Sequence, residues 1–354
     1  MIVSASMNQT LFSRRAALVG LSALTAAPAF AQTHFTQSRF EAAKAYSTAR
    51  NGISLLVMQR GKILCEDYQG QGLRLKGWEL ASGTKSFSGV MAAALVQDGL
   101  LKLDEYCADT LTEFWSDRYR SAIRVTDLLH LVSGLDGKGG RNFGEVPTYV
   151  EALAVPSTRA TGSQFSYGPV PFQIFGELVR RKLVAAKTGD SDPLAYLTRR
   201  LFTPLGIRPI RWQRGEDGLP HLPSGAAITA RDWAKFGQFV LAGGVHQGRA
   251  LVDPVALQAN FEASSANPGY GLTWWIPRPG MIGPGPRSGI AGEAVSLSGL
   301  GTLYMAAGAG NQRLYLLPDQ DMVIVRQADG IRNTLRRGAG DWSDQTFLSL
   351  VVGV

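Results

Sequence analysis

The sequence is poor in cysteine and histidine, with two and four of them among 354 residues. Cys65 and Cys107 are too few for a disulfide framework, and the sequence leaves open whether they pair. The histidines lie far apart and form no H-x-x-H or H-E-x-x-H spacing. Because there is no Cys–His cluster either, no metal site is expected. The sequence implies no organic cofactor.

A long basic run is also missing. The formal net charge is +8, yet the lysines and arginines are scattered, and pairs such as Arg180-Arg181 and Arg336-Arg337 are their densest groups. A nucleic-acid-binding protein is expected to show a basic stripe with interleaved aromatic residues. The composition therefore favours a mildly basic soluble surface, and no nucleic-acid partner is expected.

Long apolar runs are scarce, and the most distinctive one lies near the N-terminus. Arg14 and Arg15 precede an alanine-rich apolar stretch, and Ala29-Phe30-Ala31 fits an A-x-A cleavage site. The stretch is too short for a good membrane span, so none is expected in the mature form. Adjacent arginines resemble a twin-arginine signal. We predict an export signal over residues 1–31 and a periplasmic or secreted location; a retained N-terminal anchor is the alternative.

The remaining pattern places strands at both ends of the chain and helices between them. Two β-rich runs flank a tight turn at Arg60-Gly61, and an apolar helical run over residues 86–98 stops at Gly99. Helical segments separated by Gly/Pro loops follow, and strand-like runs return from about residue 300. This order predicts an α+β domain. The domain is expected to span residues 32–354. It should consist of a sheet part over about 32–100 and 240–354 and an inserted, mostly helical part over about 101–239.

Ser82-Gly83-Thr84-Lys85 is the S-x-x-K motif of the chain. At a helix start, Lys85 would lie one turn from Ser82, roughly 5 Å or less along the axis. A desolvated lysine has a lowered pKa and can act as the base for a serine nucleophile. The backbone N–H of Ser82 could then serve in an oxyanion hole. The alternative is structural, since serine is a preferred helix N-cap.

Several longer segments decide in favour of the chemical interpretation, because they resemble the serine β-lactamase and penicillin-binding superfamily. The resemblance is to its class C-like branch of β-lactamases, esterases and 6-aminohexanoate-dimer hydrolases, and it extends over most of the mature chain. The matching segments are residues 52–68, 81–105, 124–135, 201–207, 224–244 and 267–275. The resemblance implies a β-lactamase-like fold, an antiparallel sheet flanked by helices with an inserted helical region, and Ser82 and Lys85 as catalytic residues.

The family's second catalytic element is a tyrosine in a Y-x-N motif, and this chain contains no Y-x-N. Tyr167 matches the tyrosine, and Pro169 stands where the asparagine would be. The resemblance implies that Tyr167 shuttles protons between Ser82, Lys85 and the leaving group, provided that the nearby cation lowers its pKa. A packed tyrosine is the alternative. Pro169 cannot offer a side-chain amide to a substrate.

The family's third element is K-T-G on a strand. In this chain the segment at the corresponding position does not read K-T-G, and the literal K-T-G string lies elsewhere. Lys187-Thr188-Gly189 follows a helix and is interpreted as a helix end with glycine as the stop. Ser265-Ala266-Asn267 is likewise not expected to be catalytic. The positional match is Ala309-Gly310-Asn311, without the cation. We expect Gln312 or Asn311 to offer a backbone N–H to the oxyanion hole, and Asn311 to contact substrate; a hairpin without a role is the alternative.

The expected function is that of a serine hydrolase acting on a small ester, amide or short peptide-like substrate. The missing strand cation argues against a true β-lactamase or D-Ala-D-Ala peptidase, since their substrates carry a carboxylate; a non-catalytic peptidoglycan- or ligand-binding protein of the same fold is another alternative. Trp274 and Trp275 are predicted either to line an apolar pocket or to be core residues. Arg313 or Arg326 could replace the missing cation. Substrate identity, the choice between ester and amide, and oligomeric state are not readable from the sequence.

Overall fold

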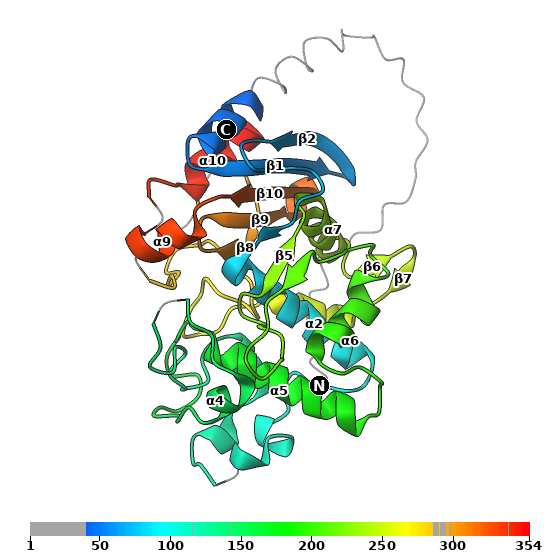
Figure 1. Cartoon of the computed structure of the whole chain (residues 1–354), viewed down its shortest axis with the longest axis vertical. Coiled ribbons are helices and arrows are strands. Elements are labelled where there is room, and N and C mark those ends of the chain that lie inside the picture. Colours follow the sequence, from blue (N-terminus) through cyan, green and yellow to red (C-terminus); the bar gives the residue numbers. More distant parts are fainter. Residues whose placement is uncertain are drawn as a thin grey trace, which may run out of the picture. The chain divides into compact units, whose positions relative to one another are not determined.

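A five-stranded antiparallel sheet combines the two ends of the chain in the order β2-β1-β10-β9-β8 (Figure 1). This computed structural model describes residues 40–354 except 115, 143, 286–289, 291–294, 297–298 and 339. The predicted export signal over 1–31 lies outside the described residues. The strands are β1 (Gly52–Gln59), β2 (Lys62–Tyr68), β8 (Tyr304–Gly308), β9 (Gln312–Leu317) and β10 (Met322–Ala328). The predicted α+β architecture, an antiparallel sheet flanked by helices, is confirmed.

Both faces of this sheet are covered, which explains why β9 and β10 are buried at every residue rather than at alternate ones. Helix α7 (Ala230–Leu241) packs against β1, β9 and β10, and a Cβ added at Gly237 would touch Leu314 and Leu316. Helix α10 (Asp344–Val352) covers the opposite face, where the Tyr315 hydroxyl donates to Asp344 at 2.6 Å. Part of α7 falls within the region that the sequence assigned to the helical part, yet this helix covers the sheet.

The predicted β1–β2 hairpin is confirmed. Arg60 and Gly61 both have positive φ, of 50° and 72°, as a two-residue turn that matches the strand twist requires. Cys65 lies on β2 and Cys107 lies in a separate short helix; both are buried free thiols. The question of their pairing is thereby answered: they do not form a disulfide.

The remaining regular elements are short, apart from two helices. Helix α2 (Ser86–Gln97) is buried from Ser86 to Leu95 and ends before Gly99, whose φ is 70°. The apolar run over residues 125–132 is helical only as far as residue 129, because Leu131 has a left-handed backbone. The helices are α3 (Val125–Leu129), α4 (Tyr149–Leu153), α5 (Val170–Ala185), α6 (Pro193–Leu197), α8 (Pro254–Gln258) and α9 (Ile331–Arg337).

Two smaller sheets and several single turns of helix complete the chain. The short strands are β3 (Trp78–Glu79), β4 (Arg211–Trp212) and β5 (Ala226–Ile228), in the order β3-β5-β4, and the pair β6 (Val245–His246) and β7 (Arg249–Ala250). The 3₁₀ turns are η1 (Ala81–Lys85), η2 (Cys107–Asp109), η3 (Thr112–Phe114), η4 (Arg120–Ala122), η6 (Ala259–Phe261) and η7 (Pro318–Gln320); η5 (Thr198–Phe202) is a π turn. Within the described ranges, no helix is both long and apolar enough to cross a bilayer.

Candidate active site

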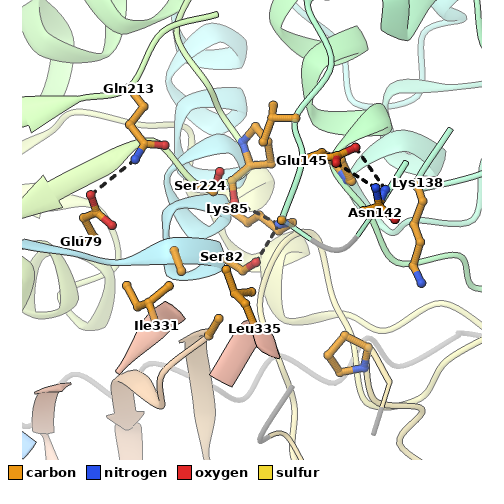
Figure 2. A pocket seen from close by; sticks show the side chains of 18 of the residues that line it. Glu79, Ser82, Lys85, Lys138, Asn142, Glu145, Gln213, Ser224, Ile331 and Leu335 are labelled. Atoms are coloured by element: carbon orange, nitrogen blue, oxygen red, sulfur yellow. Dashed lines mark hydrogen bonds between the residues drawn. The ribbon is translucent and has the colours of Figure 1, made fainter. Parts of the chain in front are cut away.

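A pocket of about 380 Å³ opens over Ser82 (Figure 2). Its walls come from η1, the short strands β3 and β4, the loop before α4, the start of α5, the end of β8 and helix α9. These segments come from sequence positions between about 79 and 335, so the chain assembles the pocket from both the sheet and the helical part. The described residues contain no group of His, Cys, Asp and Glu that could hold a metal ion.

Ser82 is placed by a 3₁₀ turn and not by a helix cap. It is the second residue of η1, which continues directly into α2, and α2 begins after Lys85 without a side-chain cap. The helix-cap alternative for Ser82 is therefore wrong. The preceding Ala81 has a left-handed backbone with φ 46°, a conformation that costs an alanine about 1 kcal/mol. This strained residue turns the chain from β3 into η1 and directs Ser82 to the pocket wall.

Lys85 is buried next to Ser82. Its Nζ lies 3.1 Å from the Ser82 Oγ and donates to the carbonyl oxygen of Pro223 at 3.0 Å. The rings of Tyr167 and Phe172 lie 4.9 and 5.2 Å from the same amine. Lys85 is 4% exposed, and burial lowers its pKa from 10.5 to about 7. A large fraction of this amine is thus neutral near pH 7, as the sequence argument expects of a base.

Tyr167 completes the cluster, but its expected pKa shift was wrong in sign. The sequence argument expected a nearby cation to lower its pKa. Instead burial raises the pKa of Tyr167, and a hydrogen bond with the Ser82 side chain opposes that rise only in part. The ring packs against Tyr270 and Trp275, with centroids 6.3 and 5.6 Å away. Tyr167 therefore stays a neutral phenol, because its surroundings are apolar and Lys85 itself is easily deprotonated.

Pro169 occupies the N-cap position of α5 and lines the pocket. The approach of this segment to its neighbour is close: a Cβ added at Gly168 would lie 1.9 Å from the carbonyl oxygen of Gly137. The missing asparagine amide has no substitute at residue 169. Polar groups that the sequence argument missed line the pocket elsewhere, namely Gln213 and Ser224.

Asn311 and Gln312 do not have the expected roles, because β8 ends earlier in the sequence than expected. This strand ends at Gly308, which pairs with Gln312 in the ladder, so Ala309 lines the pocket while Asn311 and Gln312 do not. The Gln312 side chain instead exchanges two hydrogen bonds with the backbone of Ala328. The sequence match placed the strand end about three residues too late.

The contact between β8 and η1 sets the position of Ala309. A Cβ added at Gly308 would lie 2.0 Å from the carbonyl oxygen of Leu80 and 3.0 Å from the backbone nitrogen of Gly83. Such an approach requires glycine. Ala309, the first residue beyond the strand, is thereby held beside the backbone of the Ser82 turn.

Trp274 belongs to the core and not to the pocket. It is fully buried, stacks on Phe236 with centroids 6.1 Å apart and contacts Phe261. Trp275 is also buried, and it supports Tyr167 from behind. Of the two alternatives predicted for these tryptophans, the structure shows the core position and not the pocket wall, so Trp274 is not placed to contact a substrate.

Neither arginine proposed as a replacement cation reaches the pocket. Arg313 is buried and its Nε lies 2.8 Å from Asp344. Arg326 is buried, donates to Asn311 and Arg50 carbonyl oxygens and lies over the Trp342 ring at 4.1 Å. Both guanidinium groups hold the sheet to its surroundings. Among the described residues, Lys138, Arg211 and Arg332 line the pocket in addition to Lys85, and none of these three was singled out from the sequence.

The literal K-T-G string is a helix end, as expected, but the stop is Lys187. Its φ is 53°, and the N–H groups of Lys187 and Thr188 donate to the carbonyl oxygens of Val184 and Leu183. This is a Schellman motif with lysine in the left-handed position that glycine usually takes. Gly189 lies two residues later. Asn267, of the second string, uses its side chain to hold Gly269 and Ile282.

Comparison with known proteins supports the same fold. The chain resembles a proposed 6-aminohexanoate-dimer hydrolase from Bacillus anthracis, with 17% identity, a TM-score of 0.65 and coverage of 82% of this chain and 78% of that one. It resembles a proposed β-lactamase from Bacteroides dorei with 16% identity, a TM-score of 0.68 and coverage of 90% and 98%. EstCE1, a hydrolase with promiscuous acyltransferase activity, is 12% identical, with a TM-score of 0.66 and coverage of 91% and 98%.

No curated protein sequence matches the chain. A family model, however, matches residues 36–331, which include the Ser82 turn, Lys85, Tyr167 and the end of β8. The match covers most of the chain, and the sheet, the flanking helices and the pocket lie within or next to it. On this basis the protein belongs to the β-lactamase family.

Proposed function

We propose that this protein is a serine hydrolase that cleaves a small ester or short amide through an acyl-enzyme on Ser82. The observation that carries the proposal is Lys85, which is buried, has no acidic partner among the described residues and lies 3.1 Å from the Ser82 hydroxyl oxygen. An ordinary structural lysine keeps its charge in water. A buried amine with a pKa of about 7 can take a proton from serine at neutral pH.

In the acylation step, neutral Lys85 removes the Ser82 proton as Oγ bonds to the substrate carbonyl carbon. Negative charge develops on the carbonyl oxygen, where backbone N–H groups of Ser82 and Ala309 can stabilise it. Tyr167 is the acid that protonates the leaving group as its bond breaks, and Lys85 returns the proton to Tyr167. Water then attacks the acyl-enzyme while Lys85 takes its proton, the bond between Ser82 Oγ and the acyl carbon breaks, and Lys85 returns the proton to Oγ as the acid product leaves.

An ester or short amide fits the pocket better than a β-lactam. Strand β8 ends in Ala306-Ala307-Gly308 and offers no cation for a substrate carboxylate at that edge. Pro169 offers no side-chain amide. EstCE1 and the proposed 6-aminohexanoate-dimer hydrolase share this fold, and their described activities are consistent with the proposal. A non-catalytic ligand-binding protein is the second candidate, and Pro169 is the residue that favours it.

The deciding experiment is intact mass spectrometry of the protein after exposure to a fluorophosphonate. The wild type is expected to gain one adduct and to hydrolyse p-nitrophenyl butyrate, with slow turnover of nitrocefin. Ser82→Ala should do neither. If the wild type stays unlabelled and inert, the hydrolase proposal is wrong and the ligand-binding candidate takes its place. Rapid nitrocefin turnover would instead identify a true β-lactamase.

We also propose export to the periplasm or the medium, directed by residues 1–31. The support is the Arg14-Arg15 pair followed by the apolar stretch and the Ala29-Phe30-Ala31 site. Mass spectrometry of the protein recovered from cell fractions tests this. A mature N-terminus at Gln32 in the exported fraction is the expected result, and an uncleaved chain confined to the cytoplasm would contradict it.

A further inference from the structure

The pocket contains a cation with no assigned partner, the amine of Lys138. Lys138 is exposed and lines the same pocket as Ser82. Among the described residues, its Nζ makes no ion pair or hydrogen bond. Figure 2 shows its side chain extending clear of Asn142 and Glu145, the polar residues drawn nearest to it. Glu145 is occupied, since it accepts hydrogen bonds from the side chain and backbone of Asn142.

The backbone that carries Lys138 is fixed from several directions. Its own N–H donates to Asp136 Oδ1 at 3.0 Å, and the second oxygen of Asp136 accepts from Gly140 at 2.8 Å. The carbonyl oxygen of Gly137 accepts from Val170 N at 3.0 Å, which ties the loop to the start of α5. A cation on a loop held this way is presented to the pocket at little cost in backbone entropy.

The charge balance of the pocket indicates what this cation binds. The lining includes Lys138, Arg211 and Arg332 against two acids, and one of those acids, Glu79, is paired with Arg211. Strand β8 offers no cation, and Arg313 and Arg326 are held elsewhere. An excess of positive charge in a partly enclosed site raises the local concentration of anions.

We propose that Lys138 binds an anionic group of the substrate, so that the pocket selects esters or short amides that carry a carboxylate. The inference rests on the proposed hydrolase function and names its substrate class. Lys138 is a specificity residue, because the amine contacts a part of the substrate that does not react. A charge-assisted hydrogen bond of this kind is expected to raise kcat/KM about tenfold over a neutral substrate of the same shape.

Two matched ester pairs test the proposal. One compares p-nitrophenyl butyrate with mono-p-nitrophenyl glutarate, which carries the carboxylate on the acyl half; the other compares phenyl butyrate with 4-carboxyphenyl butyrate, which carries it on the leaving half. The wild type should prefer the anionic member of at least one pair by about tenfold. Lys138→Met should abolish that preference and Lys138→Glu should reverse it. Lys102→Met, which changes an exposed lysine that does not line the pocket, should keep it.

Equal kcat/KM within both pairs, or a preference that survives in Lys138→Met, would overturn the proposal while leaving the hydrolase function intact. If no ester is turned over, the melting temperature still tests whether an anion binds at Lys138, independently of catalysis. Glutarate should raise the melting temperature of the wild type above that in sodium chloride of matched ionic strength, and Lys138→Met should lose this difference. The same glutarate effect in both proteins, or none in the wild type, would refute a site at Lys138.

Discussion

The Nζ of Lys85 lies 3.1 Å from the Oγ of Ser82, within a single 3₁₀ turn. The same nitrogen donates to the Pro223 carbonyl oxygen, and no acidic side chain among the described residues forms an ion pair with it. Two aromatic rings complete its surroundings. Nothing here balances a full positive charge, so the fold favours the neutral amine, which is the form that can accept a proton.

The activity should therefore depend on pH through Lys85. We expect kcat/KM for a neutral ester to rise as the pH increases through about 7, because deprotonation of Lys85 creates the base. Since burial raises the pKa of Tyr167, its phenol should keep its proton well beyond that range. A pH–rate profile on p-nitrophenyl butyrate measures this. A profile that falls across the neutral range would contradict the role of Lys85 as base.

Replacing Lys85 by methionine should separate activity from stability. We expect Lys85→Met to lower kcat about 10²- to 10⁴-fold. Near pH 7 we expect its free energy of unfolding to be about 1–3 kcal/mol higher than that of the wild type. The unfolded chain binds a proton at Lys85 below pH 10.5, whereas the folded protein does so only below about 7. Wild-type stability should thus rise with pH between these values.

Urea unfolding of both proteins, at about pH 7 and again at about pH 10, checks the stability claim. The advantage of Lys85→Met should shrink at the higher pH, because that pH lies close to the ordinary lysine pKa of 10.5, so the loss of the Lys85 proton on folding costs far less there than near pH 7. Equal stability of the two proteins at the lower pH would mean that the fold does not penalise the charge on Lys85.

Gly308 should tolerate no side chain. An alanine methyl group would lie 2.0 Å from the Leu80 carbonyl oxygen, so either β8 or the Ser82 turn must move. We expect Gly308→Ala to destabilise the fold by about 1–3 kcal/mol and to lower kcat. Ala309→Gly is the comparison, because it keeps the backbone N–H that the oxyanion needs. Melting curves and initial rates measure both; unchanged rates in Gly308→Ala would argue against a close strand–turn contact.

The Lys187-Thr188-Gly189 string should be mutable without loss of activity. Lys187 has φ 53°, which glycine adopts without the penalty that lysine bears. We expect Lys187→Gly to stabilise the protein by about 1 kcal/mol and Gly189→Ala to destabilise it, since Gly189 has φ 83°. Chemical denaturation gives the stabilities. A fall in kcat/KM in Lys187→Gly would return this string to the list of catalytic candidates.

The sequence predicted the β1–β2 hairpin and the proximity of Ser82 to Lys85 correctly, because both depend on local pattern. The hairpin turn at Arg60-Gly61 and the spacing of Ser82 and Lys85 within one turn are local properties. The sequence could not predict the sign of the Tyr167 pKa shift. That sign depends on Tyr270 and Trp275, which arrive from a segment a hundred residues away.

The errors at the end of β8 and at Trp274 have a related cause. A strand end within a glycine-rich turn is poorly marked by residue type, so Asn311 and Gln312 seemed as suitable as Ala309. Trp274 packs against Phe236 and Trp275 packs against Tyr167, and both are buried. A pair of adjacent tryptophans in a sequence does not reveal whether either side chain lines a pocket or lies in the core. The pocket cations were missed because Lys138 and Arg332 lie in segments without a recognisable motif.

The pairing of β1 with β10 has a consequence for synthesis. Strand β1 is made before the Ser82 turn, but its partner on one side, residues 322–328, is made only after that turn and the whole helical part. Until then the nascent chain carries the Ser82 turn beside an incomplete sheet, and the edge of β1 that pairs with β10 is open to other chains. A chain that stops before residue 322 lacks β10 and should thus aggregate rather than fold, so synthesis of β10 is the step that completes the sheet.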